Sequence, residues 1–413
     1  MNELSDMETE LREQGADEWD EFCAAELPAE LQTPSPGFAM AEPGLTVAEV
    51  DELMQDAAIC ELENRYTDLA QVVAIAEQFQ EWCAERPDGE SVLLQAEEGV
   101  DYWFAGDLHA AFDVLLAAWA LVRDRAQKSG RRGCLVLLGD VMDRGMDDIP
   151  CLAMIEDMLM RGGVDGVSVL YLRGNHDEAL RQSPRGVFYS QVVPAETADT
   201  LNELRAEGPH GAAEAVGRAA MELSRVAPVV AELTGLGLPQ SSATIMLAHG
   251  GLPHLDLQEY ALTHADEFPV KEGAPLYESV PEEERPKWSD DFLWNRLKPR
   301  VASCPPLRGM AGNYMGTHDV NTYRAIHYRL TGRAVTCLVR GHDHEPEGWR
   351  LYSYDPVYNE AESRDMQRNC TVLGINTMGH AADNSYFSRA LPSLVHWCYG
   401  APVITLYRLP VRR

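Results

Sequence analysis

The chain has 413 residues, of which 45% are hydrophobic, and carries a formal net charge of −32 at pH 7. This length and hydrophobic content suffice for one large domain or two ordinary ones. The strong acidity excludes a nucleic-acid-binding module, which needs many basic residues to neutralise phosphates, and it opposes binding to anionic membranes. The nine cysteines are scattered without a CxxC pair and are interpreted as reduced thiols. With no basic and apolar leader at the start, a cytoplasmic location is expected.

The first 44 residues differ in composition from the rest of the chain. They are dominated by Glu and Asp and end in a stretch rich in Pro, Ser and Gly, so residues 1–44 are interpreted as an acidic, disordered tail and linker. Docking of a basic protein partner and autoinhibition are the alternatives to a purely solubilising role. Thr46 followed by Glu49 forms a capping box, and apolar residues then recur at helical spacing to about residue 85. This pattern predicts two helices leading into a single domain at residues 45–413.

Short apolar runs in the remaining sequence predict seven strands, at residues 102–105, 134–138, 168–172, 244–248, 335–339, 371–375 and 402–407. Amphipathic stretches at residues 112–125 and 149–160 separate the first three runs, which predicts a βαβαβ opening. The later runs are separated by loops, which indicates a mixed sheet or a second sheet packed on the first. Two inserts are expected, a helical one at residues 179–238 and a loop-rich one at residues 255–307.

Five of the predicted strands end at a cluster of polar residues. The sequences GDLH at residues 106–109, GD at 139–140 and GNHD at 174–177 follow the first three strands, and HGG at 249–251 and GHDH at 341–344 follow two later ones. Functional groups in open α/β sheets gather at the carboxyl ends of the strands, so these clusters are expected to converge. The candidate ligands are Asp107, His109, Asp140, Asn175, His249 and His342.

This donor set is the one that two divalent cations require, with a carboxylate to bridge them and imidazole, carboxylate and amide groups around each. Taken alone, each cluster reads more readily as an ordinary turn, and a single histidine such as His249 as a hydrogen-bonded core residue. Five clusters in order, each at a strand end, predict a dinuclear metal centre. Such a centre is suited to hydrolysis of phosphate esters.

The five motifs resemble those of the phosphoprotein phosphatase family of calcineurin-like metallophosphoesterases, whose signatures are GDxHG, GDxxDRG, GNHE, HGG and a final RxH or GHxH. The likeness covers about residues 46–407, and GDVMDRG at residues 139–145 is its most specific part. The resemblance implies an α/β metallophosphoesterase fold, in which helices flank two packed mixed β-sheets. A divergent bacterial-type member is indicated.

The resemblance also implies a role for each matching residue. Asp107 and His109 bind one metal, Asp140 bridges, and Asn175, His249 and His342 bind the other. A hydroxide that bridges the metals attacks phosphorus. His176, held by Asp143, is the general acid that protonates the leaving oxygen, and Arg144 binds the phosphate.

Two further assignments are left open at this stage. A second phosphate-binding arginine is expected between the HGG and final histidine motifs, and both Arg308 and Arg296 are candidates, each with an ordinary surface position as its alternative. Thr377 stands where eukaryotic members carry an active-site tyrosine.

Three residues depart from the family pattern. Ala110 replaces the usual glycine and is expected to fit only at negative φ, so that the turn after His109 would differ. Asp177 replaces the usual glutamate, as in bacterial-type members. His344 creates a GHxH sequence, which adds a metal ligand in the wider superfamily and none in the strict phosphatase branch.

The predicted function is hydrolysis of phosphate monoesters with two divalent metal ions, Mn²⁺ in the first place and Fe or Zn as alternatives. The predicted substrate is a phosphorylated protein, at serine or threonine and with tyrosine as a further candidate. The alternative is hydrolysis of a dinucleoside polyphosphate or another small phosphorylated metabolite. A pseudo-enzyme that only binds partners is disfavoured, because it would have no need of the complete ligand set.

Overall fold

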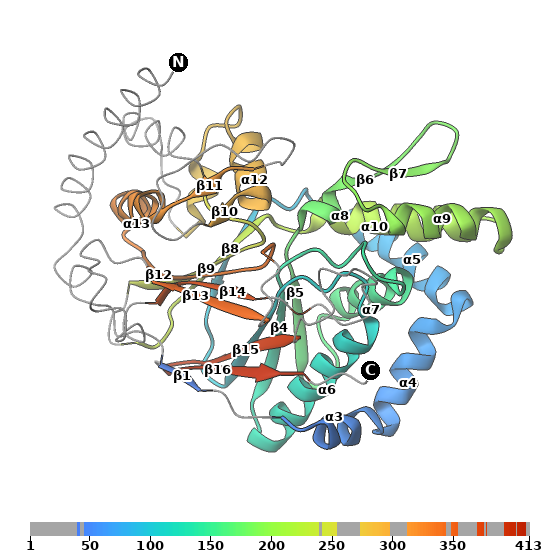
Figure 1. Ribbon diagram of the computed structural model, residues 1–413, viewed down its shortest axis with the longest axis horizontal. Coiled ribbons are helices and arrows are strands. Elements are labelled where there is room, and N and C mark those ends of the chain that lie inside the picture. Colours follow the sequence, from blue (N-terminus) through green and yellow to red (C-terminus); the bar gives the residue numbers. More distant parts are fainter. Residues whose placement is uncertain are drawn as a thin grey trace, which may run out of the picture.

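The computed structural model describes residues 39–41, 45–238, 242–253, 273–297, 312–343, 348–353, 370–375, 377, 392–401 and 403–409. Two six-stranded sheets form the centre of this described part (Figure 1). The first sheet has the order β1 (Ala39–Ala41), β16 (Val403–Arg408), β15 (Ser393–Cys398), β3 (Val100–Ala105), β4 (Arg132–Leu137) and β5 (Val167–Tyr171). The second sheet has the order β13 (Trp349–Ser353), β14 (Cys370–Ile375), β12 (Ala334–Arg340), β9 (Ala243–Ala248), β8 (Val230–Thr234) and β2 (Ser91–Gln95).

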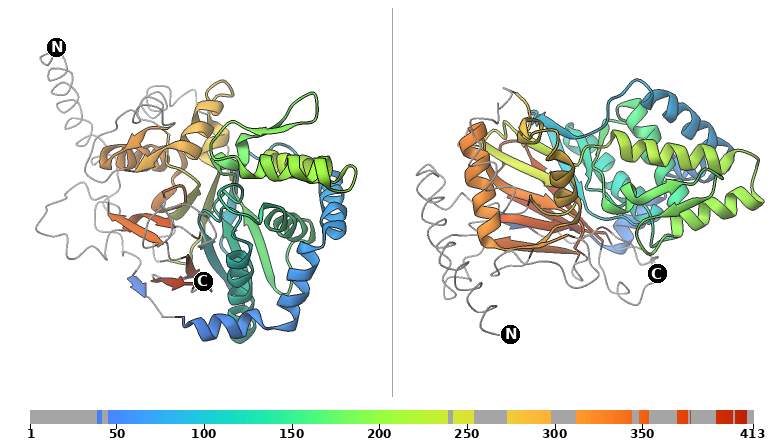
Figure 2. Two further views of the ribbon diagram at one scale, coloured as in Figure 1. Left: turned by 45° about the vertical axis from the view of Figure 1, so that its right-hand side comes forward. Right: turned by 90° about the horizontal axis from the view of Figure 1, so that it is seen from above.

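Helices cover the outer faces of both sheets, which gives four layers (Figure 2). The helices beside the first sheet are α3 (Val47–Met54), α4 (Ala57–Thr67), α5 (Leu69–Cys83), α6 (Phe112–Ser129), α7 (Asp148–Arg161), α8 (Asn175–Ala179), α9 (Glu196–Glu207) and α10 (Ala212–Val226). Those beside the second sheet are the 3-10 helix η2 (Leu276–Ser279), α12 (Arg285–Trp294) and α13 (Thr317–Thr331). Two small ribbons complete the fold, β6 (Leu180–Gln182) with β7 (Phe188–Ser190), and β10 (Arg296–Leu297) with β11 (Tyr314–Met315).

Three clusters of buried hydrophobic side chains hold these layers together. One lies between the first sheet and its helices, one between the two sheets, and one between the second sheet and the α12–α13 side. Trp103 of β3 and Trp119 of α6 belong to the first cluster, Phe104 to the second and Trp288 to the third. Neighbouring residues of β3 therefore face opposite layers, as the two-residue period of a strand requires.

The structure confirms the predicted fold class, and all seven predicted strands occur within two residues of their expected ends. Strands β3, β4 and β5 pair in parallel through α6 and α7, which confirms the βαβαβ opening. The capping box is also present, because the Glu49 N–H donates to Thr46 Oγ1 over 3.2 Å and Thr46 N–H donates to the Glu49 carboxylate over 2.8 Å.

Two sequence expectations about the helical parts need correction. The segment up to residue 85 forms three helices, because Asp56 and Asp68 each accept a hydrogen bond from the backbone two residues ahead and so start α4 and α5. The range predicted as a helical insert, residues 179–238, contains α9 and α10 but also β8, an inner strand of the second sheet. The acidic tail, apart from residues 39–41, lies outside the described residues, as does most of the predicted loop-rich insert.

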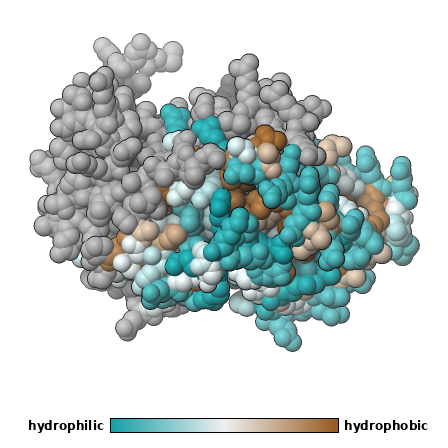
Figure 3. Space-filling view, turned by 90° about the horizontal axis from the view of Figure 1, so that it is seen from below, coloured by the Kyte–Doolittle hydropathy of each residue, from teal (hydrophilic) through white to brown (hydrophobic). Residues whose placement is uncertain are grey.

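Hydrophilic residues predominate among the described residues on the face shown in Figure 3. Among the described helices, none combines the length and the apolar character needed to cross a membrane.

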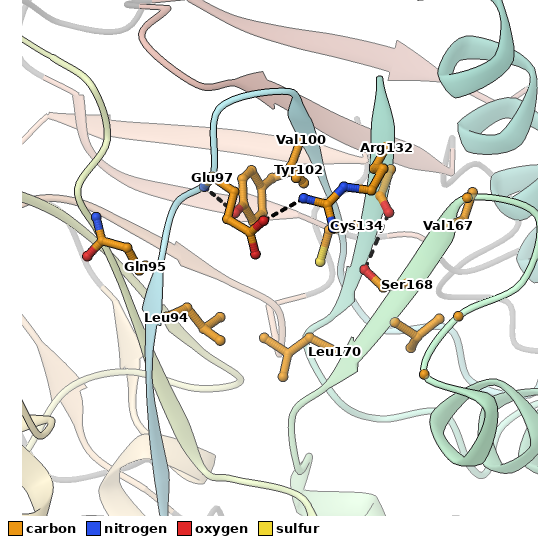
Figure 4. A pocket seen from close by; sticks show the side chains of 15 residues that line it. Leu94, Gln95, Glu97, Val100, Tyr102, Arg132, Cys134, Val167, Ser168 and Leu170 are labelled. Carbon is orange, nitrogen blue, oxygen red and sulfur yellow. Dashed lines mark hydrogen bonds and ion pairs between the residues drawn. The ribbon is translucent and has the colours of Figure 1, made fainter. Parts of the chain in front are cut away.

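A cavity of about 460 Å³ opens between the sheets at the start of the parallel strands (Figure 4). Its walls include Tyr102 of β3, Cys134 of β4 and Leu170 of β5, and an ion pair between Glu97 and Arg132 crosses its rim. This cavity lies at the opposite end of β3, β4 and β5 from the polar clusters. It is therefore separate from the predicted metal centre.

Glu232, a buried residue of β8, ties three elements of the second sheet's side together. Its carboxylate accepts a hydrogen bond from Arg333 Nε over 2.9 Å and one from the Leu276 N–H over 2.8 Å, and it lies 3.2 Å from His327 Nε2. Burial alone would raise the pKa of Glu232, but His327 and Arg333 outweigh it and lower the pKa to about 2. The charged carboxylate is therefore part of the folded structure.

Glu232→Gln is expected to lower the free energy of unfolding at pH 7 by about 3 kcal/mol, since it leaves a buried cation without its partner. Because the folded pKa is below the ordinary value of 4.5, this contribution is complete above about pH 4.5 and is lost as the pH falls through about 2. Urea unfolding of both proteins from pH 7 to pH 2 checks both statements. The control is Glu222→Gln, which breaks a half-exposed ion pair with Arg225 and should cost less than about 1 kcal/mol. Equal losses in the two variants would contradict the expectation.

Candidate active site

The five polar clusters meet where the carboxyl ends of the two sheets face each other. Strands β3, β4 and β5 of the first sheet lead into the turns with Asp107, Asp140 and Asn175, and strands β9 and β12 of the second lead to His249 and His342. All six predicted ligands are buried, and they are Asp107, His109, Asp140, Asn175, His249 and His342. The sequence therefore predicted correctly which strand ends converge.

Asp140 lies at the centre of this group. Its Oδ2 atom is 3.7 Å from His109 Nε2 and 3.3 Å from His249 Nε2. Its Oδ1 atom accepts the backbone N–H of His176 over 2.8 Å. Two sets of candidate ligand atoms share this residue, one with His109 and His176 and the other with His249 and His342. A carboxylate common to two sets is the arrangement that a bridging ligand needs.

The imidazoles are oriented so that their Nε2 atoms face this centre. His109 and His249 each direct Nδ1 at a backbone carbonyl 2.8 Å away, that of Met142 and that of Leu138, respectively. Such a bond fixes the ring with Nε2 facing the centre, where His249 Nε2 lies 2.8 Å from Asn175 Oδ1. His342 Nε2 is buried and has no hydrogen-bond partner in the described part of the chain. Nitrogen and carboxylate oxygen donors of this kind fit divalent cations.

Charge is unevenly distributed over these groups. Burial would raise the pKa of Asp140, but His249 and His176 hold it well below its usual range. Burial would lower the pKa of His249, yet Asp140 and Asp107 raise it to about 9. Desolvation lowers the pKa of both His109 and His342 well below the ordinary value. The site thus combines an ionised carboxylate with two neutral imidazoles, those of His109 and His342, whereas a cation would have to displace a proton from His249.

His176, Asp143 and Arg144 form a second unit beside the ligands. His176 Nδ1 lies 2.8 Å from Asp143 Oδ2, and its Nε2 atom is 3.0 Å from Arg144 Nη2. The His176 ring meets the His109 ring edge to face, with 5.0 Å between the centroids. The Asp143 carboxylate thus holds the imidazole at Nδ1, and the Arg144 guanidinium lies next to Nε2 on the other side of the ring. This is a geometry suited to proton transfer next to a bound anion.

A family model described as calcineurin-like phosphoesterase matches residues 101–346, more than half of the chain, including all five strand-end motifs. The chain belongs to the calcineurin-like phosphoesterase family. Serine/threonine-protein phosphatase 1 of Salmonella typhimurium is 29% identical over 122 residues, which are 30% of this chain and 50% of that protein. The chain therefore matches about half the length of this relative.

A solved structure of a serine/threonine phosphatase from Saccharomyces cerevisiae, with similarity to human phosphatase PP5, superimposes with a TM-score of 0.51 at 12% identity. The superposition covers 89% of this chain and 97% of that one. The structural match confirms the predicted fold, and the Salmonella relative confirms the predicted resemblance to the phosphoprotein phosphatases.

In this phosphoesterase, Asp177 acts as a clamp on the backbone of two motifs. Its carboxylate accepts N–H groups from Gly174 over 2.7 Å, from Asp140 over 2.9 Å and from Val141 over 3.1 Å, and it also accepts the Tyr171 hydroxyl. Burial and the nearby Asp140 raise the pKa of Asp177 to about 6. Aspartate at this position thus holds the turn that presents Asp140. The sequence identified the substitution but not this role.

The start of α9 supplies contacts to the phosphoesterase site that the sequence did not reveal. The Thr197 N–H donates to Asp143 Oδ1 over 3.0 Å, and Glu196 accepts the Arg144 N–H over 3.0 Å. Asp148 accepts both the Asp143 N–H, over 2.8 Å, and the Thr197 hydroxyl. These residues fix the backbone of the Asp143–Arg144 turn. The sequence offered one indirect signal, the position of Asp148 three residues after the GDxxDRG motif.

The expectation that Ala110 has negative φ is wrong, because its φ is +56°. The turn is held in this left-handed form by the Ala110 N–H, which donates to the Val141 carbonyl over 2.7 Å. His109, Asp140, Asp143, Arg144 and His342 also have positive φ. Gly145 accommodates the close approach, since a Cβ atom there would lie 2.4 Å from the His109 carbonyl oxygen. The turn after His109 therefore has the left-handed backbone conformation that the usual glycine would adopt at position 110.

Of the remaining candidates, the structure describes Arg296 and Thr377. Arg296 in β10 reaches toward the site, with Nε 3.9 Å from Asp343 Oδ1, and its charge contributes to lowering the pKa of His342, after the larger effect of burial. Arg308 and His344 lie outside the described residues. Thr377 is fully buried and accepts the Gly106 N–H over 2.8 Å while donating to the Ser393 carbonyl, so it joins β3 to β15.

Proposed function

We propose that this phosphoesterase is a dinuclear metal-dependent phosphatase acting on phosphorylated serine and threonine residues of proteins. The observation that carries the proposal is the convergence on Asp140 of two groups of metal-ligating side chains, one with His109 and His176 and one with His249 and His342, next to Asp143 and Arg144. Asp107, His109 and Asp140 would hold one cation. Asp140, Asn175, His249 and His342 would hold the other.

Two bound divalent cations supply activation of water and neutralisation of charge in a displacement at phosphorus. The chain's own residues supply the rest. The Arg144 guanidinium offers parallel N–H donors to two phosphate oxygens. His176 Nε2 delivers a proton to the leaving oxygen, and Asp143 keeps the ring in position through Nδ1. We propose Mn²⁺ as the metal, since the donors are nitrogen and oxygen without thiolate.

A protein substrate is supported by the Salmonella relative, and two exposed apolar residues close in sequence to Arg144 and Glu196 are candidates for contacts with it. Met146 and Val193 are 79% and 86% exposed, the two largest values among the exposed large hydrophobic residues of the described chain. Met146 follows Arg144 by two residues, and Val193 precedes Glu196, the acceptor of the Arg144 N–H, by three. Exposed apolar side chains of this kind can contact residues that flank a phosphorylated side chain.

The proposal is tested with metal-free enzyme supplied with Mn²⁺, Fe²⁺, Zn²⁺ or Mg²⁺ in turn. Phosphoserine, phosphothreonine and phosphotyrosine peptides are compared with diadenosine tetraphosphate, simple nucleotides and p-nitrophenyl phosphate. We expect the highest kcat/KM on phosphoserine or phosphothreonine peptides with Mn²⁺. A preference for diadenosine tetraphosphate would replace the proposed substrate with a dinucleoside polyphosphate, and inactivity on every ester would refute the phosphatase.

Met146→Glu and Val193→Glu test these two residues as substrate contacts. Each is expected to raise KM for a phosphopeptide with apolar flanking residues by about tenfold, since losing a buried apolar contact costs about 1–2 kcal/mol. KM for p-nitrophenyl phosphate should stay the same, because this small ester has no flanking residues to contact them. The matched control is Val187→Glu, at an exposed position of the β6–β7 loop that is six residues further from Glu196 than Val193 is. A parallel rise of KM for both substrates would argue against peptide contacts.

A further inference from the structure

A second cluster of metal-ligating side chains lies at the other end of the first sheet. Asp101 is at the start of β3, and His396 and Cys398 are in β15. The two strands are antiparallel neighbours, and Cys398 is the direct cross-strand partner of Asp101. His396 is two residues before Cys398 on the same strand and so shares its face. The pairing of the strands thus brings a carboxylate, an imidazole and a thiol to one point.

The distances from His396 to the other two side chains are compatible with a tetrahedral zinc site. His396 Nε2 lies 3.3 Å from Cys398 Sγ and 3.6 Å from Asp101 Oδ2, and all three ligand atoms lie within 4.8 Å of one another. With Zn–S near 2.3 Å and Zn–N or Zn–O near 2.0–2.1 Å, the edges of a tetrahedron are about 3.3–3.6 Å. Both distances fall in this range, so the three side chains are spaced to share one cation.

The surroundings hold the three side chains in this arrangement. The His396 ring stacks on Trp103 with 4.2 Å between the centroids, which fixes the side on which Nε2 projects. Arg131 Nε donates to Asp101 Oδ1 over 2.6 Å, so Oδ2 is the oxygen that faces His396. A carboxylate whose second oxygen is hydrogen-bonded is the usual form of a metal ligand. The His396 side chain is 15% exposed, which leaves access for an ion and a water ligand.

We propose that Asp101, His396 and Cys398 form a zinc site, with water as the fourth ligand, that fastens β15 to β3. Thiolate and imidazole together select Zn²⁺ over Mn²⁺ or Mg²⁺, unlike the nitrogen and oxygen donors of the active site. The strand rises about 3.3 Å per residue, so this site is roughly 20 Å from Asp107. It is therefore separate from catalysis and independent of the proposed function.

A reactive cysteine is the competing interpretation of the same residues. Burial and the charge of Asp101 raise the pKa of the Cys398 thiol to about 11. A nucleophilic cysteine requires the opposite shift. A thiol with a raised pKa still becomes a ligand, since a coordinating metal ion deprotonates it outright.

Co²⁺ bound to the full-length protein provides the test, because a thiolate ligand gives cobalt a charge-transfer absorption in the near ultraviolet. No cysteine is among the proposed ligands of the active site, so this band reports the new site alone. We expect the band in the wild type and in Asp140→Asn, with saturation at one equivalent of thiolate-bound Co²⁺ and displacement by Zn²⁺. Cys398→Ser and His396→Gln should lose it.

The matched control is Cys134→Ser, which removes another partly buried thiol near the same end of the sheet, in β4. It should keep the band. Turnover of p-nitrophenyl phosphate with Mn²⁺ should be unchanged in all three cysteine and histidine variants, which verifies their folding. A wild type without the band, or a band that survives in Cys398→Ser, overturns the proposal.

Alkylation of the wild type gives a second readout that needs no variant. Zn²⁺ should slow the reaction of Cys398 with iodoacetamide at least about tenfold, as mapped by peptide mass, because a coordinated thiolate is shielded from the reagent. The reaction of Cys134 should not change. Equal rates at Cys398 with and without Zn²⁺ would also overturn the proposal.

Discussion

Asp140→Asn is expected to lower kcat/KM for every phosphate ester by about 10³-fold or more. The substitution removes the one charge shared by both ligand sets, whose Oδ2 atom lies 3.3 Å from His249 Nε2 and 3.7 Å from His109 Nε2. A metal centre contributes several kcal/mol to transition-state stabilisation, and each 1.4 kcal/mol is about a factor of ten. The amide keeps an Oδ1 acceptor for the His176 N–H, so the turn itself should survive.

Elemental analysis of the same variant should show fewer than two equivalents of active-site metal. Asp147→Asn is the matched control, because it removes an exposed aspartate from the same loop and should keep metal content and turnover. Turnover of Asp140→Asn within tenfold of the wild type, at full metal content, would show that Asp140 does not bridge.

His176→Asn is expected to lower kcat for a phosphoserine peptide by about 10²–10⁴-fold, the usual effect of removing a general acid. For p-nitrophenyl phosphate the loss should not exceed about tenfold, because the leaving nitrophenolate needs little protonation. Only a residue that protonates the leaving oxygen produces this dependence on the leaving group. Steady-state kinetics on the two substrates, at the same Mn²⁺ concentration, provides the measurement.

Asp143→Asn is the companion variant for this pair. It leaves the imidazole in place and removes the carboxylate 2.8 Å from Nδ1, so the same pattern should appear with a smaller amplitude. Equal losses on both substrates in His176→Asn would show that His176 binds phosphate or supports the site, and does not act as the acid.

The sequence predicted well which polar residues come together, because each cluster of candidate ligands follows a strand directly. Once β3, β4, β5, β9 and β12 are recognised from their apolar runs, the geometry of sheets places their carboxyl ends together. The bridging position of Asp140 came from the family resemblance, and its contacts with His109 and His249 agree with it. The strand pattern and the family motifs therefore identify the same residues around Asp140.

The parts that the sequence did not predict depend on contacts between distant segments. Thr197 and Asp143 are 54 residues apart, and nothing near either one indicates that they hydrogen-bond. Strand β8 was missed because its inner position in the second sheet depends on pairing with β2, which is far away along the chain, as well as with the neighbouring β9. The φ of Ala110 was misjudged because steric preference was considered without the bond to Val141 that overrides it.

Of the seven non-glycine residues with positive φ in the described chain, six lie in the turns of the site. Each such residue costs about 1–2 kcal/mol relative to an ordinary conformation. Mutation to glycine would relieve that cost, but at the ligand positions it would also remove the donor atom. Ala110 alone carries no donor, and its codon is a single nucleotide from glycine. Within these turns, Ala110→Gly is therefore the one substitution that could raise thermal stability without loss of a functional side chain. Further gains in thermal stability must come from the sheets and helices around the turns.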